Sequence, residues 1–168
     1  NLLANGDDIQ ITRIIYNYTR KMAAITEAAD NVAIGAFALS AEDTRSGSVA
    51  IGRDALLVQN AVGGNPYNVA IGYETGTADW GDANVAVGYR ALKVNTASTN
   101  VAVGKEAMLS NTTGTNNVAV GGQALDANTT ASFNSAVGYN ALTDNTTGAN
   151  NTALGYDALG SNTTASNN

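Results

Sequence analysis

A nine-residue pattern of apolar and polar positions recurs eight times along this chain, and its clearest copy is residues 84–92, Asn-Val-Ala-Val-Gly-Tyr-Arg-Ala-Leu. Each copy contains one glycine, numbered here as position zero: Gly35, Gly52, Gly72, Gly88, Gly104, Gly121, Gly138 and Gly155. Successive glycines are 17, 20, 16, 16, 17, 17 and 17 residues apart. A repeat this short is typical of a solenoid, in which each repeat forms one coil and buries its apolar side against its neighbours.

The positions that lead up to each glycine favour a short β-strand. Position −1 is always aliphatic, position −2 is always alanine, and position −3 is valine in six copies and then Ser135 and Thr152. Because side chains alternate along a strand, positions −3 and −1 share one face, and the alanine shares the other with the glycine. From the constancy of position −1 we expect an inner aliphatic lining there, deeper than position −3. The constant alanine predicts a close approach by another group.

A second apolar patch follows each glycine, because positions +3 and +4 are Ala-Leu in most copies, with two variable residues between. The connectors are rich in Asn, Thr and Gly, which are turn residues. We therefore expect two short strands and two turns per coil, with parallel coils stacked at about 4.8 Å, so that eight coils extend roughly 40 Å. The Asn-x-Thr sequons in these connectors follow from the turn repeat and need no glycan.

Two segments depart from the repeat. Residues 1–30 lack it, and their apolar positions fit either one face of a helix or, over residues 9–12, a strand. We expect this segment to be a cap over the first coil or a junction between chains, and residues 31–168 to be the repeat domain, continuing beyond residue 168. An insertion at residues 63–67 contains the only proline, and the next coil lacks Ala-Leu but contains Trp80. Trp80 either fills the space of the missing leucine or joins Tyr67 in an aromatic contact site.

Composition and charge narrow the function classes. The net charge is −6 and no Lys or Arg follows Lys105, so no basic stripe for nucleic acid is expected. The chain contains no cysteine, which predicts no disulfide. No run of eighteen apolar residues predicts a membrane span in this segment. Because coils lined by Ala, Val and Leu bury little area, we expect the chains to associate side by side.

The sequence offers little catalytic chemistry. It contains neither His nor Cys, and its carboxylates are scattered singly, so we predict no catalytic, cofactor or metal site and no enzyme. Adjacent coils place Glu74 beside Arg90 and Arg90 beside Glu106, which predicts a small solvated ion-pair ladder. The candidate receptor contacts are aromatic residues, for which a purely structural edge ladder is the alternative: Tyr67, Trp80, Tyr73, Tyr89, Tyr139 and Tyr156.

The phrase Asn-(Val/Ser/Thr)-Ala-(Ile/Val/Leu)-Gly-x-x-Ala-Leu resembles the head repeats of trimeric autotransporter adhesins, which form left-handed parallel β-rolls. The Asn-Thr-Thr-Gly connectors are more similar to those of bacteriophage tail fibres. The resemblance covers residues 31–168 and implies an all-β, parallel β-roll homotrimer outside the cell.

Three functions remain open. The first is a structural section of a phage tail fibre or similar virion appendage used in host attachment. The second is an adhesin head on a bacterial surface that binds a cell-surface glycan or protein receptor. The third is an ice- or surface-binding solenoid, against which the placement of the Thr pairs in turns counts.

Overall fold

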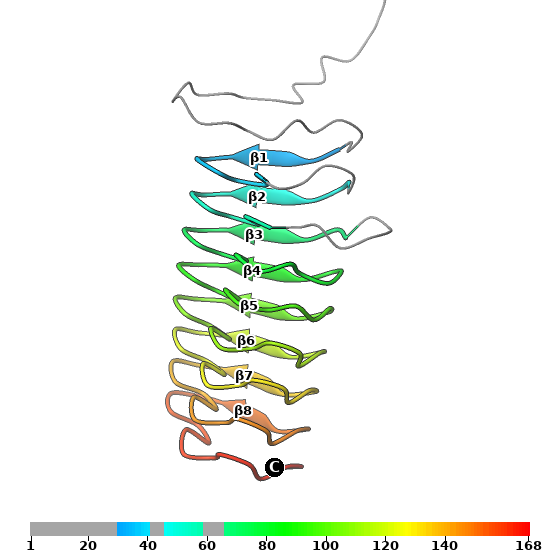
Figure 1. The fold of residues 1–168 in the computed structure, drawn as a ribbon. Coiled ribbons are helices and arrows are strands. Elements are labelled where there is room, and N and C mark those ends of the chain that lie inside the picture. Colours follow the sequence, from blue (N-terminus) through cyan, green and yellow to red (C-terminus); the bar gives the residue numbers. More distant parts are fainter. Residues whose placement is uncertain (1–29, 41–45, 59–65) are drawn as a thin grey trace, which may run out of the picture.

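The computed structural model describes residues 30–40, 46–58 and 66–168. These residues form an all-β parallel solenoid of about seven turns, which confirms the predicted fold class. Figure 1 shows the strands stacked one above another along one side of the solenoid. The strands are β1 (Val32–Ile34), β2 (Val49–Ile51), β3 (Val69–Ile71), β4 (Val85–Val87), β5 (Val101–Val103), β6 (Val118–Val120), β7 (Ser135–Val137) and β8 (Thr152–Leu154).

The sheet follows the order of the sequence from β1 to β8, and every neighbouring pair is parallel. The register repeats without a slip, because the central alanine of each strand pairs with the alanine of the next, as Ala86 does with Ala102. The prediction of two strands per coil is wrong within the described residues, where each coil has one three-residue strand and no helix occurs. The Ala-Leu segment forms turns instead.

The small side chains of the strands point into the solenoid and the branched ones point outward. The central alanines of β2 to β7 are 0% exposed, whereas Val118 and Val120 on either side of one of them are each 37% exposed. The expectation of an inner aliphatic lining at position −1 is therefore wrong. The valines do lie one above another in register, but the narrow interior admits only alanine.

The opposite wall of the coil is built from the Ala-Leu segment. In every coil from β1 to β7 that contains this segment, its alanine and its leucine (Met108 in one coil) are buried, and they form one core cluster with the strand alanines. The leucine takes a left-handed backbone conformation, with φ of 46° at Leu56 and 47° at Leu92. This conformation is uncommon for a branched residue, and here it turns the side chain into the core of every coil.

The glycine column explains why no other residue is found at position zero. Gly88 has φ of 138°, which side chains rarely adopt, and a β-carbon on it would overlap the carbonyl oxygen of Gly104 in the next coil. The same overlap recurs from Gly35 to Gly138. This close approach lies between backbones at the glycine, two positions beyond the alanine at which the sequence predicted one.

Two columns of buried asparagines join the coils. In the first column, which precedes the strands, the Asn100 side chain accepts a hydrogen bond from the backbone N–H of Asn117 (3.0 Å) and donates one to the carbonyl of Gly114 (2.8 Å). In the second column, which lies in the connectors, Asn111 Nδ2 donates to Asn95 Oδ1 (2.7 Å). These amides satisfy backbone groups that the thin coil buries away from water.

Several sequence-based predictions lie outside the described residues. They are the helix or strand within residues 1–29 and most of the insertion, residues 63–65. In the part of the chain that the structure describes, no helix has the length and apolar character needed to cross a membrane.

Candidate functional site

The most extensive surface feature is an outward-facing band of aliphatic side chains, which we call the aliphatic face. It consists of the first and last residues of the eight strands: Val32, Ile34, Val49, Ile51, Val69, Ile71, Val85, Val87, Val101, Val103, Val118, Val120, Ser135, Val137, Thr152 and Leu154. None of these sixteen residues is charged. All are half-buried or exposed, with Val32 at 43% and Ile34 at 44%. Fourteen of the sixteen residues are aliphatic, and Ser135 and Thr152 are the exceptions. An uncharged and mainly apolar band of this length is typical of an interaction surface.

Two of the predicted receptor contacts, Tyr73 and Tyr89, form a stacked pair in adjacent coils. Their ring centroids are 5.7 Å apart and the planes differ by 12°. The guanidinium of Arg53 lies 5.6 Å from the Tyr73 centroid, and that of Arg90 lies 4.9 Å from the Tyr89 centroid. Each ring is therefore already in contact with another ring and with a cation, so that little ring face remains for stacking against a sugar.

Tyr139 and Tyr156 repeat this arrangement further along the solenoid. Their centroids are 5.8 Å apart with an angle of 11° between the planes, and the Tyr139 hydroxyl lies 3.0 Å from Gln123 Oε1. The Tyr139 ring also lies against Gly122, where a β-carbon would meet it at 3.2 Å. These contacts fit the edge ladder that was the structural alternative, although Tyr156 remains 78% exposed.

Tyr67 and Trp80, which one of the two interpretations of the sequence joined in an aromatic site, are in different environments. Tyr67 is 63% exposed and lies over Gly47 of the preceding coil. Trp80 is 0% exposed, and its Nε1 donates a hydrogen bond to the Leu92 carbonyl (3.1 Å). A β-carbon on Gly76, at the position of the missing leucine, would lie 2.6 Å from the indole ring. Trp80 therefore fills the core, and as a buried residue it is not available to a receptor.

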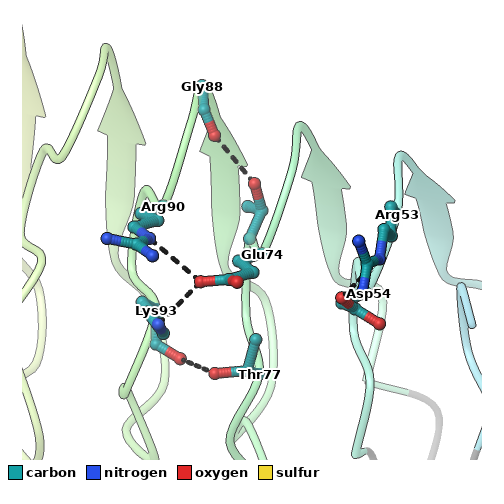
Figure 2. Close-up of polar contacts among 8 residues, drawn as sticks. Arg53, Asp54, Glu74, Thr77, Gly88, Arg90 and Lys93 are labelled. Atoms are coloured by element: carbon teal, nitrogen blue, oxygen red, sulfur yellow. Dashed lines mark hydrogen bonds and ion pairs between the residues drawn. The ribbon is translucent and has the colours of Figure 1, made fainter.

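Figure 2 shows a charged cluster of Glu74, Arg90 and Lys93. Glu74 and Arg90 directly follow Tyr73 and Tyr89 in the sequence. Glu74 Oε2 is 2.7 Å from Lys93 Nζ and 2.9 Å from Arg90 Nε. The hydrogen bond from Lys93, with those from Tyr73 and Arg90, lowers the pKa of Glu74 to about 2 against the opposing effect of burial. The predicted pair of Glu74 with Arg90 is confirmed, whereas Glu106 pairs with Lys105 at 3.5 Å. This cluster joins neighbouring coils, because Arg90 and Lys93 of one coil both bind the Glu74 carboxylate of the coil before it.

Asp126 is the one described residue with a buried side-chain oxygen that lacks a hydrogen-bond partner. Burial raises the pKa of this carboxyl, and the nearby charge of Glu106 raises it further. Among the described residues no group of three His, Cys, Asp or Glu side chains is placed to hold a metal ion. Asp126 is thus an isolated acidic group on an otherwise regular coil.

The connector threonines and asparagines use their polar groups within the chain. Thr112 Oγ1 donates to the carbonyl of Thr129 (2.9 Å), and Thr96 Oγ1 donates to that of Thr112 (3.0 Å). The sequon residues Asn111, Asn128 and Asn145 are 0% exposed. Thr96 and Thr112 thus donate their hydroxyl protons to the next coil, which makes these two hydroxyls poor ligands for an ice surface. A buried amide cannot carry a glycan in the folded chain.

Sequence reasoning did not identify the aliphatic face as a surface, nor Phe133 as an exposed aromatic residue at 60%. The only signal for the first was the constant alanine, which is the smaller side chain and would suit a narrow interior, but the sequence does not give the width of that interior. Comparison with protein-family models, curated proteins and solved structures finds no match to this chain.

Proposed function

We propose that this chain is a structural section of an extended fibre that acts outside the cell in host attachment, as in a phage tail fibre, and that its copies pack side by side through the aliphatic face. The observation that carries the proposal is the continuity of that face over eight successive strands without a charged residue. A face of this kind would bring unfavourable contact with water along the whole solenoid if it remained uncovered.

A second copy of the same chain is the partner that best fits this surface. The aliphatic rows repeat at the spacing of the coils, because the strands pair in unbroken register. Only a partner with the same spacing between its rows can match them along their full length, and a second copy of this chain has that spacing. Three copies around one axis is the arrangement that the resemblance to trimeric fibres implies.

The interior supports a role under mechanical load rather than in catalysis. Each coil is joined to the next by backbone pairing and by the asparagine columns, as between Asn100 and Asn117. Such repetition gives a straight element whose length is set by the number of coils. This is what a fibre section requires.

The native mass in solution tests the proposal. Sedimentation equilibrium of the 168-residue chain is expected to give three times the chain mass of 17.0 kDa. Replacing Val103 and Val120 with Asp should convert the assembly to monomers while the circular dichroism of the coil is retained, because both side chains point outward. The matched control is Thr113→Asp with Thr130→Asp on an exposed connector row, which should leave the mass unchanged. A monomeric wild-type chain would refute the packing proposal.

The exposed tyrosine edges favour a second candidate, an adhesin head that contacts a receptor. Tyr139 is 49% and Tyr156 is 78% exposed, and both lie in the same row. Binding of the wild-type assembly to a glycan array, abolished by Tyr139→Ala with Tyr156→Ala, would support this candidate. Equal binding by the two proteins would exclude these tyrosines as the contact.

A further inference from the structure

The residue two positions before each strand has a left-handed backbone conformation throughout the described coils. We call this set the edge row, because it borders the aliphatic face on the side where the strands begin. Its members are Asp30, Gly47, Tyr67, Ala83, Thr99, Asn116, Phe133 and Asn150. Gly, Asn and Asp are the residues that tolerate this conformation best, and they make up half of the row.

Tyr67, Ala83, Thr99 and Phe133 depart from this preference, and Phe133 and Tyr67 are the largest of the four. Both are bulky aromatic residues with φ of 62° and 50°, and they are 60% and 63% exposed. A ring placed there brings conformational strain, yet most of its surface faces water. Neither the local backbone nor the core therefore explains Phe133, and a local rule broken without a gain inside the chain points to a role in binding.

The position of the two rings ties them to the aliphatic face. Phe133 lies beside the start of β7, and Tyr67 lies beside the start of β3. Four coil steps separate them, which corresponds to about 19 Å along the solenoid. Exposed aromatic rings at the border of an uncharged apolar surface have the character of interface anchors.

A periodic face has a physical weakness that such anchors remove. Because the aliphatic rows repeat at every coil, two copies displaced by one coil would bury nearly the same rows as two aligned copies. A periodic pattern of this kind specifies register weakly unless something interrupts it. Phe133 and Tyr67 are the aromatic interruptions of the edge row.

We propose that Phe133, together with Tyr67, anchors the contact between neighbouring copies and fixes their alignment along the fibre. This inference rests on the proposed side-by-side packing of copies. Each ring meets the same ring of the adjoining copy at the border of the aliphatic face, so a shift by one coil separates both pairs of rings.

Cysteine crosslinking measures the alignment directly, because the chain has no cysteine of its own. Chains carrying Val120→Cys are coexpressed with chains carrying Val137→Cys, and the disulfides formed on mild oxidation are identified by peptide mass. Aligned copies join like positions, whereas copies displaced by one coil join Cys at residue 120 to Cys at residue 137. The dissociation constant of the assembly is measured in parallel by sedimentation without the cysteine changes.

The test variant is Phe133→Asn, which places the favoured residue of the row at this position. We expect like crosslinks to predominate in the parent protein, and unlike crosslinks to rise to a comparable amount in Phe133→Asn. The dissociation constant should weaken by roughly tenfold or more. Adding Asn150→Phe to Phe133→Asn, which moves the ring by one coil in every copy, should restore both values. Tyr156→Asn, an exposed aromatic residue in another row, is the matched control and should change neither.

The failures are distinguishable. A parent chain that is monomeric overturns the proposed packing and this inference with it. A parent assembly whose crosslink ratio and dissociation constant are both unchanged in Phe133→Asn overturns the anchoring role alone. Loss of the folded circular dichroism signal in Phe133→Asn would also contradict it, because the ring would then be needed by the coil itself.

Discussion

Trp80 occupies the part of the core that a leucine fills in most other coils, and this replacement gives the sharpest test of the fold. Gly76 stands where Leu56 and Leu92 stand in the coils before and after it, and its φ of 67° is close to theirs. A β-carbon there would lie 2.6 Å from the Trp80 ring and 3.1 Å from Leu56 Cδ2. Trp80 and a leucine at position 76 therefore compete for one space.

This competition sets the expected free energies of unfolding. Trp80→Ala removes a fully buried ring and its hydrogen bond to the Leu92 carbonyl, which should destabilise the chain by about 3 to 5 kcal/mol. Gly76→Leu alone should cost about 1 to 3 kcal/mol through overpacking against the indole. In the double variant the leucine enters the vacated space, so the loss should be smaller than the sum of the two by roughly 1 to 3 kcal/mol.

The assay is urea unfolding of the four proteins followed by far-ultraviolet circular dichroism, since tryptophan fluorescence is absent from two of them. The native mass of each protein is checked first, so that a change of association is not read as a change of folding. Losses that add without any coupling would refute the idea that Trp80 replaces the leucine.

Three further predictions concern the coil contacts. Asn117→Asp should destabilise the chain by roughly 3 kcal/mol at pH 7, because a buried carboxylate would face the carbonyl to which the amide now donates. The control Asn150→Asp, at an exposed position, should change the free energy of unfolding by no more than about 0.5 kcal/mol. Thermal melts at pH 7 and pH 3 should show the difference between the two variants shrinking as the new acid is protonated. Gly104→Ala should reduce or abolish folding, because its β-carbon would overlap the next glycine; a melting temperature equal to that of the parent would contradict this. The pKa of Glu74 is lowered from 4.5 to about 2, so its stabilising effect is complete above pH 4.5 and is lost as the pH falls toward 2. The melting temperature of the parent should therefore exceed that of Glu74→Gln above pH 4.5, and the difference should decrease as the pH falls toward 2. A difference that does not change with pH would contradict the ion pairing with Lys93.

The parts of the fold that could be predicted are those that depend on a few adjacent residues within each repeat. The eight strands begin and end within the predicted phrase, since β-branched residues before a glycine favour a strand wherever they occur. The direction of the faces could not be decided in the same way, because alanine and valine are equally regular. Which one lies inside depends on the width of the coil, and that width follows from the opposite wall.

The absence of a second strand has a related cause. Leu56 and the leucines equivalent to it have positive φ, a conformation that no propensity of leucine indicates. It is imposed by the need to close a coil of sixteen or seventeen residues around a very small core. Short-range patterns contain no signal for such a constraint.

Among the candidate site residues, the sequence foresaw the stacking of Tyr73 with Tyr89 because equal positions in adjacent coils lie above one another. It left Trp80 between core and surface, since only coordinates show that the space at Gly76 is empty of a side chain. Phe133 was overlooked because a single aromatic residue before a strand looks like any other interruption of a repeat.

The hydrogen bonds between coils all run along the axis of the solenoid, and this direction decides how the molecule responds to tension. A pull on its two ends loads these contacts in series, so that an isolated chain would yield at its weakest coil boundary, whatever the strength of the others. Neighbouring chains held along the aliphatic face would share the force among several boundaries at the same height. Lateral association would thereby raise the force needed to separate two successive coils.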